Sequence, residues 1–519
     1  MPFCYVMMKT LALLAALALV PCALPAQAAE RADTPKKGKV RLSFIPTVET
    51  WEAAFGPAGR QPVGGFLSGD SLGPSAFPSL AGMQSAVQRA SGISAFAASL
   101  GRTLLAIRSE RRIMPLAAEV GLTDRLSLNV MVPIVRVDVR ETLNVDSTRG
   151  NLGLNPLYFG GAARFTTFFA NFDNALTALN GQITGGTCVP RCAEALTLYN
   201  QGVALRAALD KAVYGTGPSS QSPFLPLAAS AAGKGIDTTV IGLQRQLQDS
   251  FGIAGFADTL GLPTFAAAPS DIEQVLSDPT FGYAYTPIQR TPKFYRYWPG
   301  DAEVSVKYRV LETPAYAGAV KLTVRLPTGH VASPNDPFAL STGDHQTDLE
   351  LGYIQELTLW NRLWLNLNVR AGLQLAGLRD ARVAPQGAFW IPIGASARLD
   401  WKPGNYAAVD FAPMYRFSKV FSTGVTASYY RQGLDRYTYR SSADSTTIAA
   451  NLGAPVSASV LDPGTNRRYW QLGVAVTYQG PVWETGFSIQ QTVSGWGAAT
   501  SVPAATTFRI VIRAFHGLF

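Results

Sequence analysis

The chain has 519 residues, a mean hydropathy of +0.10 and a hydrophobic content of 47%. Beyond the first thirty residues, no uncharged apolar run approaches the roughly 18 residues that a membrane-spanning helix needs, so the apolar residues must be distributed by alternation. The net charge of +9 suits contact with anionic lipid headgroups, but it is too weakly clustered to indicate nucleic-acid binding.

The first residues have the order of a secretory signal. Lys9 precedes an apolar run over residues 11–20, and Ala26-Gln27-Ala28 is a small-x-small cleavage site. A membrane anchor is the alternative, but the run is too short to span comfortably. A lipoprotein would use Cys22, and Pro21 before it fits poorly. The sequence therefore predicts a signal peptide over residues 1–28, cleaved after Ala28, and Sec-dependent export.

The next segment, residues 29–140, alternates as strands do over 39–51, 103–120 and 124–137. Between the first two strands, residues 54–102 are rich in Gly, Pro, Ser and Ala and predict a long loop. The turn over 121–124 is short, as periplasmic turns of membrane barrels are, so the following connection is expected outside the cell.

That connection is an insertion over residues 141–297 that contains no Trp. Its apolar residues recur with helical spacing, as in Leu196, Leu205 and Leu209, and in Leu243 and Leu247. We interpret it as a largely helical extracellular domain or as a plug folded into the barrel mouth. Partly disordered surface decoration is the alternative.

Two cysteines remain in the mature chain, Cys188 and Cys192, within this insertion. In an oxidising compartment, a C-x-x-x-C loop predicts a local disulfide, and metal binding is disfavoured because no histidine lies nearby.

The C-terminal segment, residues 298–519, has the clearest strand pattern. From Leu363 to Leu375 every odd position is apolar, and the positions between them include Asn366, Asn368 and Arg370. A period of two places each set on one face of a strand. Similar runs occupy 302–310, 320–326, 349–357, 391–401 and 407–417, and further strands start near 421, 468, 482 and 506.

A soluble β-sandwich also alternates, but its strands average five or six residues, whereas these runs reach about ten to fourteen, the length that crosses a bilayer at a tilt. Eight tryptophans fall in or beside these runs, where interfacial aromatic girdles belong: Trp298, Trp360, Trp364, Trp390, Trp401, Trp470, Trp483 and Trp496. The predicted fold is an all-β transmembrane antiparallel barrel. The runs number about thirteen, and because single-chain bacterial barrels have even strand numbers, we expect 12 or 14.

The chain ends at Phe519. A terminal Phe closing an amphipathic strand is typical of the signal that the barrel assembly machinery recognises, which indicates the outer membrane of a Gram-negative cell.

If the apolar positions face lipid, charged side chains of neighbouring strands face the lumen, with basic residues on one strand opposite acidic residues on the next. These charges form either a salt-bridge ladder that stabilises the wall or a polar constriction that sorts permeants, and the two roles are compatible. The predicted lumen-facing residues are Glu303, Lys307, Arg309, Lys321, Arg325, Asp348, Glu350, Glu356, Arg370, Arg398, Asp400, Asp410 and Arg416.

Three segments resemble a known family: 119–135 (EVGLTDRLSLNVMVPIV), 300–308 (GDAEVSVKY) and 324–329 (VRLPTG). They are similar to segments of the outer-membrane transporters linked to phenol meta-cleavage pathways, relatives of the FadL-type channels. The resemblance covers residues 103–140 and 299–435, rests on structural motifs, and implies a barrel that transports hydrophobic or aromatic molecules. The large helical insertion departs from the family's usual pattern.

No phosphate-binding loop or metal-ligand cluster is evident, and no cofactor is expected. Ser341, Asp344 and His345 could be drawn as a hydrolase triad, but three adjacent polar residues are far more often a polar loop. The sequence therefore predicts a non-enzymatic barrel for passive uptake of small hydrophobic or aromatic permeants, with outer-membrane lipid, lipopolysaccharide and the assembly machinery as partners. A barrel-anchored surface protein whose insertion binds a partner is the alternative, and a membrane hydrolase is third.

Overall fold

The computed structural model describes residues 30–215, 222–287, 297–385, 388–480, 482–497 and 502–517. The predicted signal peptide and the terminal Phe519 lie outside these residues. Within them, no helix is long and apolar enough to cross a membrane.

The main sheet is a closed, twelve-stranded antiparallel barrel. Each wall strand pairs with its sequence neighbour, and the last strand closes the ring on the first, with Arg41 opposite Phe515 and Thr47 opposite Arg509. The first wall strand is split at Ile45-Pro46 into β1 (Lys39–Phe44) and β2 (Thr47–Trp51). The other wall strands are β5 (Arg102–Gly121), β6 (Leu126–Asp146), β10 (Glu303–Glu312), β11 (Tyr316–Arg325), β12 (Asp348–Leu359), β13 (Leu363–Gln374), β16 (Tyr406–Arg416), β17 (Phe421–Gln432), β19 (Arg467–Gln479), β20 (Trp483–Trp496) and β21 (Thr506–Gly517).

Alternation gives the wall an apolar outer face. Leu116, Leu322 and Leu351 are each more than half exposed, as lipid-facing side chains of a barrel are. Tight turns join the strands at one end; at Trp360-Asn361 both residues have positive φ, 49° and 58°, as the hairpin turn of type I′ requires. Because short turns face the periplasm in such barrels, the longer connections at the other end are extracellular.

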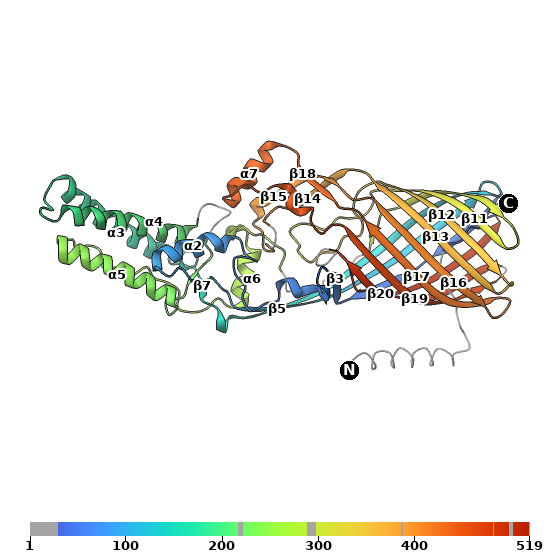
Figure 1. Cartoon of the computed structure of the whole chain (residues 1–519), viewed down its shortest axis with the longest axis horizontal. Coiled ribbons are helices and arrows are strands. Elements are labelled where there is room, and N and C mark those ends of the chain that lie inside the picture. Colours follow the sequence, from blue (N-terminus) through green and yellow to red (C-terminus); the bar gives the residue numbers. More distant parts are fainter. Residues whose placement is uncertain are drawn as a thin grey trace.

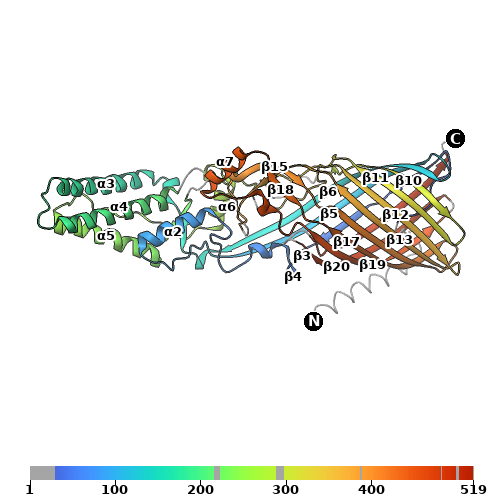
Figure 2. The same cartoon turned by 45° about the horizontal axis from the view of Figure 1, so that its top comes forward.

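The hairpin of β5 and β6 extends far beyond the rest of the wall toward the helices (Figure 1). These two strands pair continuously from Gly121–Ser127 to Arg102–Asp146. Beyond their tip, α3 (Ala162–Thr184), α4 (Cys192–Tyr214) and α5 (Ala231–Phe251) lie side by side, with α2 (Ser79–Ser91) packed against α4 and α5 (Figure 2). The helices pack because each carries one apolar stripe, such as Phe165, Phe168 and Phe172 on α3.

Smaller elements occupy the space between the barrel and the helices. The short strands are β3 (Ala53–Gly56), β4 (Gly59–Pro62), β7 (Leu152–Leu154), β8 (Phe224–Pro226), β9 (Trp298–Pro299), β14 (Gly377–Arg382), β15 (Ser396–Lys402) and β18 (Arg436–Tyr439), and the remaining helices are α6 (Pro269–Ser277) and α7 (Ser442–Leu452). Single 3₁₀ turns cover Val63–Leu67, Ser147–Arg149, Pro156–Tyr158, Pro279–Phe281, Ile393–Ala395 and Ala458–Leu461.

The expectation of a wall strand over 391–401 is wrong. This stretch leads into β15, which pairs with β14 and β18 in a three-stranded sheet outside the barrel. One face of β15 packs into a separate core that includes Val383, Leu399 and Trp401. Because only this face is buried, β15 has the same alternating pattern as a wall strand. Removing it leaves twelve of the thirteen predicted runs, which is the observed strand number.

Two further expectations need correction. Residues 54–102 are not simply a loop, because they contain the β3–β4 hairpin and helix α2, whose Leu80, Met83 and Val87 are buried at helical spacing. The tryptophans do not all form girdles. Trp298, Trp360, Trp470 and Trp483 are exposed, whereas Trp364, Trp390 and Trp401 are buried in polar or aromatic interiors.

Candidate functional site: the interior and mouth of the barrel

The interior of the barrel is polar. On β13, Asn366 and Asn368 are buried, whereas the flanking Leu365 and Leu367 point outward and are half-buried. The same period of two places Ser305 and Lys307 of β10, and Glu350 and Glu356 of β12, inside. The inward set on each strand is therefore the polar one.

The segment before β1 lies inside the barrel and contacts several wall strands. Ala32 is fully buried, and its backbone N–H donates to Glu356 Oε1 at 2.8 Å. Asn366 Nδ2 donates to the Glu30 carbonyl oxygen at 2.7 Å, and Lys321 Nζ pairs with Glu30 Oε1 at 2.8 Å. We call residues 30–34 the N-terminal segment; it fills the lumen near the periplasmic end, where Thr34 Oγ1 donates to the Asp124 carbonyl oxygen.

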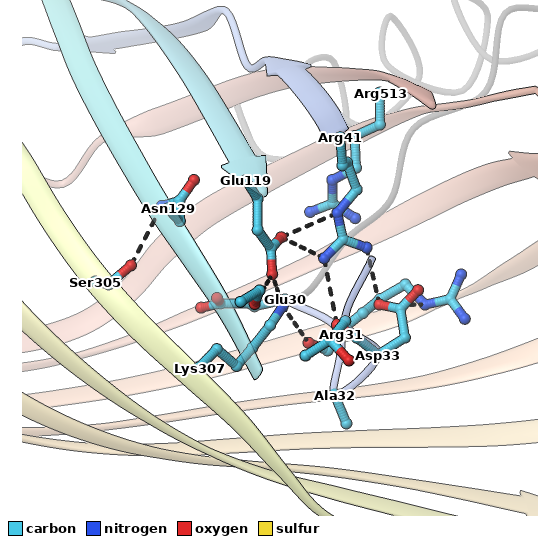
Figure 3. A network of polar contacts seen from close by, with 12 residues as sticks. Glu30, Arg31, Ala32, Asp33, Arg41, Glu119, Asn129, Ser305, Lys307 and Arg513 are labelled. Atoms are coloured by element: carbon cyan, nitrogen blue, oxygen red, sulfur yellow. Dashed lines mark hydrogen bonds and ion pairs between the residues drawn. The ribbon is translucent and has the colours of Figure 1, made fainter. Parts of the chain in front are cut away.

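Charged side chains hold this segment to the wall (Figure 3). Arg41 of β1 joins Asp33, at 2.9 Å, to Glu119 of β5, to which its Nε donates at 3.0 Å. Glu119 also pairs with Lys307 at 2.9 Å and accepts from Ser127 Oγ. Arg31 pairs with Glu484 of β20 at 2.7 Å. Each of these buried charges has a partner of opposite sign. Removing one partner would leave the other charge buried and unpaired, which costs about 3–5 kcal/mol of stability.

A second layer of ion pairs lies nearer the extracellular side. Arg325 of β11 bridges Glu303 of β10 at 3.0 Å and Asp348 of β12 at 2.9 Å. Arg370 pairs with Asp410 at 2.9 Å. These pairs cross between adjacent strands, so opposite charges lie beside each other around the wall.

The predicted lumen residues separate into three groups. Glu303, Lys307, Lys321, Arg325, Asp348, Glu350, Glu356, Arg370 and Asp410 lie in the interior networks. Arg309 lies at the periplasmic turns, bonded to the Asp124 carbonyl oxygen and paired with Glu312, and Arg416 ends β16 beside the next turn. Arg398 and Asp400 are not in the lumen: they belong to β15 outside the barrel, where Asp400 lies 3.8 Å from Arg440.

Sequence reasoning missed seven charged residues of the interior network. The wall strands contribute four of these residues at buried, inward positions: Arg41, Glu119, Glu484 and Arg513. Parity would have found all four. Glu30, Arg31 and Asp33 carry no local signal, because nothing in a short polar segment shows that it folds back into a lumen.

The extracellular mouth has a cluster of aromatic rings. Trp390 is fully buried, with its ring centroid 4.7 Å from Phe389, 5.3 Å from Tyr285 and 6.0 Å from Phe77. Phe338 packs against both Phe389 and Trp390. We call these five residues the mouth cluster; they come from four separate connections on the extracellular side.

A buried arginine ties these connections together. Arg382 of β14 donates to the carbonyl oxygens of Tyr283 and Ile391 at 2.7 and 2.6 Å and to Asn335 Oδ1 at 2.6 Å. Its guanidinium lies 3.8 Å from the Tyr285 ring centroid. Burial lowers the pKa of this guanidinium from its ordinary value. One side chain thus fixes three loops around the mouth cluster.

Two of the segments that carry the family resemblance, 300–308 and 324–329, meet at the rim. The Asp301 carboxylate accepts from the backbone N–H of Gly329 at 2.8 Å and of Asp344 at 2.9 Å. A Cβ on Gly343 would lie 2.3 Å from Asp301 Oδ2, so only glycine allows this approach. Burial, together with the carboxylates of Asp348 and Asp301, raises the pKa of Asp344 to about 6.

The polar loop residues proposed as a triad are not aligned for catalysis. Ser341 Oγ accepts from the Ala332 N–H and Asp344 Oδ1 from the Gln346 N–H, so neither is directed at His345, whose side chain is exposed. In the described part of the chain, no group of three or more His, Cys, Asp or Glu residues could hold a metal ion. Cys188 and Cys192 are joined by a disulfide at the α3–α4 connection.

A closed antiparallel barrel with an apolar outer belt and a polar interior defines the class of transmembrane β-barrels of the outer-membrane type. No family model matches the chain, and no curated protein matches it.

Solved structures that are similar to this chain include outer-membrane channels. An outer-membrane channel from Pseudomonas putida F1 is 7% identical, covers 94% of this chain and 100% of its own, and superposes with a TM-score of 0.43. The Pseudomonas putida toluene transporter TodX is 9% identical over 93% of this chain and 89% of its own, with a TM-score of 0.26. The CymD monoaromatic hydrocarbon channel is 10% identical over 92% and 88%, with a TM-score of 0.27. Values this low carry no substrate from these channels to this chain.

Proposed function

We propose that this protein is an outer-membrane channel for passive uptake of small hydrophobic or aromatic molecules. The observation that carries the proposal is the mouth cluster. Five aromatic side chains from separate loops converge on the extracellular side, above a polar interior. Because the rings are held by loops rather than by one rigid element, an apolar permeant can part them and replace ring–ring contacts with its own.

The N-terminal segment is proposed as the periplasmic gate. The segment leads into β1, and hydrogen bonds and ion pairs such as Glu30–Lys321 and Arg31–Glu484 hold it to the wall. These contacts can exchange for water in one step if the segment slides toward the periplasm, and the lumen is then open at that end.

The wall offers an alternative exit, which would not require the periplasmic gate to open. The β6–β10 ladder covers only Leu126 to Met131 of β6, and next to it comes Pro133, which has no N–H to donate. Among the described residues, the Gly300 N–H donates to the Pro133 carbonyl oxygen, and β9, which itself contains Pro299, pairs with Ile134 and Val135 of β6. This seam, with six residue pairs between β6 and β10, is where an apolar permeant can leave for the membrane.

The gate is tested by tethering it. Ala32 of the segment and Ala319 of β11 belong to one small buried cluster, so Ala32→Cys with Ala319→Cys places two thiols in that cluster, and mass spectrometry shows whether they form a disulfide. In proteoliposomes, oxidation should slow uptake of a panel of monoaromatics at least tenfold, and reductant should restore it. Ala32→Cys alone and the unsubstituted protein, treated identically, control for reduction of Cys188–Cys192. Unimpaired uptake with the cross-link verified by mass spectrometry refutes the gate; no uptake in any state refutes the channel.

The filled interior favours a second candidate. With the N-terminal segment in place, charged side chains occupy the periplasmic half of the lumen, as expected of a barrel that serves only as an anchor. The helices would then bind a partner outside the cell. The tethering experiment separates the two, since an anchor gives no uptake of monoaromatics or sugars with or without the cross-link.

A further inference from the structure

The outer face of the β5–β6 hairpin changes abruptly from apolar to cationic. Going outward from the periplasmic turn, the outward pairs are Leu116 with Val132 and Met114 with Ile134, and the next pair is Arg112 with Arg136. The outward apolar positions on β6 extend from Leu126 to Ile134, a stretch of nine residues, and a tilted transmembrane strand has about 9–11. Arg112 and Arg136 therefore lie where hydrocarbon gives way to headgroups.

The arginines are paired with each other across the strands. Arg112 lies directly opposite Arg136, and Arg108 directly opposite Arg140, with Glu110 opposite Asp138 between them. Like charges directly opposite destabilise a sheet. With Arg60 of β4, we call these five arginines the outer arginine strip. Among the described residues, Glu52, Glu110 and Asp138 form ion pairs with Arg108, Arg112 and Arg140 of the strip, at 3.7, 2.5 and 3.6 Å.

The strip borders a groove. A cavity of about 720 Å³ between the β3–β4 and β5–β6 hairpins is lined by Arg60, Arg108 and Arg140 together with apolar side chains such as Leu104 and Ile107. Tyr297 and Trp298, both exposed, flank the belt edge, with the Arg136 guanidinium 5.9 Å from the Tyr297 ring. Aromatic side chains at this level are typical of the membrane interface.

We propose that the outer arginine strip binds the phosphate groups of a phosphorylated glycolipid of the outer leaflet, of the lipid A type, with its acyl chains on the belt below and its sugars in the groove. The lipid-binding proposal depends on the barrel lying in the outer membrane, and it does not depend on whether the barrel transports a permeant. Guanidinium groups bind phosphate through two parallel hydrogen bonds, and a doubly charged phosphate between opposed arginines replaces their repulsion with attraction. An acidic protein partner fits less well, because the site begins at the apolar belt.

The test measures retention of defined lipids by the full-length protein in detergent, using native mass spectrometry. The unsubstituted protein should bind bisphosphorylated lipid A and should lose at least tenfold in affinity for the same lipid with its phosphates removed. Equal binding of the two lipids overturns the proposal and needs no variant. Inorganic phosphate at millimolar concentration should compete only weakly; binding as tight as that of lipid A would make the strip a free-anion site instead.

Variants locate the site. Arg112→Gln with Arg136→Gln should weaken lipid A binding at least tenfold, and the matching lysine pair should retain part of it. Arg245→Gln with Arg440→Gln removes the same charge from exposed positions outside the strip and should leave binding unchanged. Heat-modifiable gel mobility verifies folding. Equal loss in the control pair overturns the assignment, because it would indicate a general charge effect.

Discussion

At the scale of single residues, adjacent positions on a wall strand place their side chains in different surroundings, one against the membrane and the next in the polar interior. Leu367 and Asn368 of β13 are adjacent, yet Leu367 faces outward and Asn368 is buried opposite Asp410 in the interior. This alternation makes the consequences of one substitution differ sharply between neighbours.

Leu367→Arg should therefore destabilise the barrel by about 2–4 kcal/mol, since it puts a charge near the middle of the apolar belt. Asn368→Arg should fold, because the new guanidinium lies across from the Asp410 carboxylate. The measurement is the fraction folded by heat-modifiable gel mobility. If both variants fold equally well, the lipid-face assignment of β13 is wrong.

The rim carries a residue with a predictable pH response. The folded protein holds the Asp344 proton up to about pH 6, whereas the unfolded chain releases it near its ordinary value of 3.8. Between pH 3.8 and 6 the folded state therefore binds more protons at this group than the unfolded state does. The free energy of unfolding is then higher at low pH and decreases as the pH rises toward 6. Asp344→Asn should abolish that part of the pH dependence of thermal unfolding. A variant with the unsubstituted protein's profile between pH 4 and 6 would exclude this role.

At the scale of elements, strand alternation allowed most of the wall to be predicted, and its failure at 391–401 has a specific cause. A period of two reports that a strand has one buried face, but not what buries it. The β15 strand buries Leu399 and Trp401 against Val383, α7 and β18 rather than against lipid. The N-terminal segment and the mouth cluster escaped prediction because both form through contacts between residues far apart in the sequence.

The seam between β6 and β10 makes a separate prediction. Pro133→Val supplies an N–H donor at the edge of the ladder and should slow the exit of an apolar permeant from the barrel. Pro413→Val, in the middle of the wall on β16, is the matched control and should leave uptake unchanged. Equal uptake by all three proteins would place the exit elsewhere.

At the scale of the whole molecule, the barrel and the helices are stabilised by different forces. The wall depends on a closed ladder of hydrogen bonds, and the helices depend on a buried apolar core that includes Phe168, Phe172 and Leu209. We therefore expect two unfolding transitions.

The disulfide should affect only one of them. Cys188→Ser with Cys192→Ser opens a short loop, worth about 2 kcal/mol by the chain-entropy relation, and should lower the helical transition measured by circular dichroism at 222 nm. The heat-modifiable gel shift of the barrel should stay where it was. A shift of both transitions would mean that helices and wall unfold as one unit.

The continuous pairing of β5 with β6 sets how far the molecule reaches. Beyond Ile134 the ribbon continues to Asp146, which adds about 40 Å along the strand, and the helices add their own length beyond that (Figure 1). The α3–α4 connection therefore lies at the end of the molecule farthest from the barrel, well outside the membrane (Figure 1). A large molecule that approaches the cell from outside would therefore contact this tip before it could reach the rim of the barrel, so we expect the helices to shield the rim from such contacts.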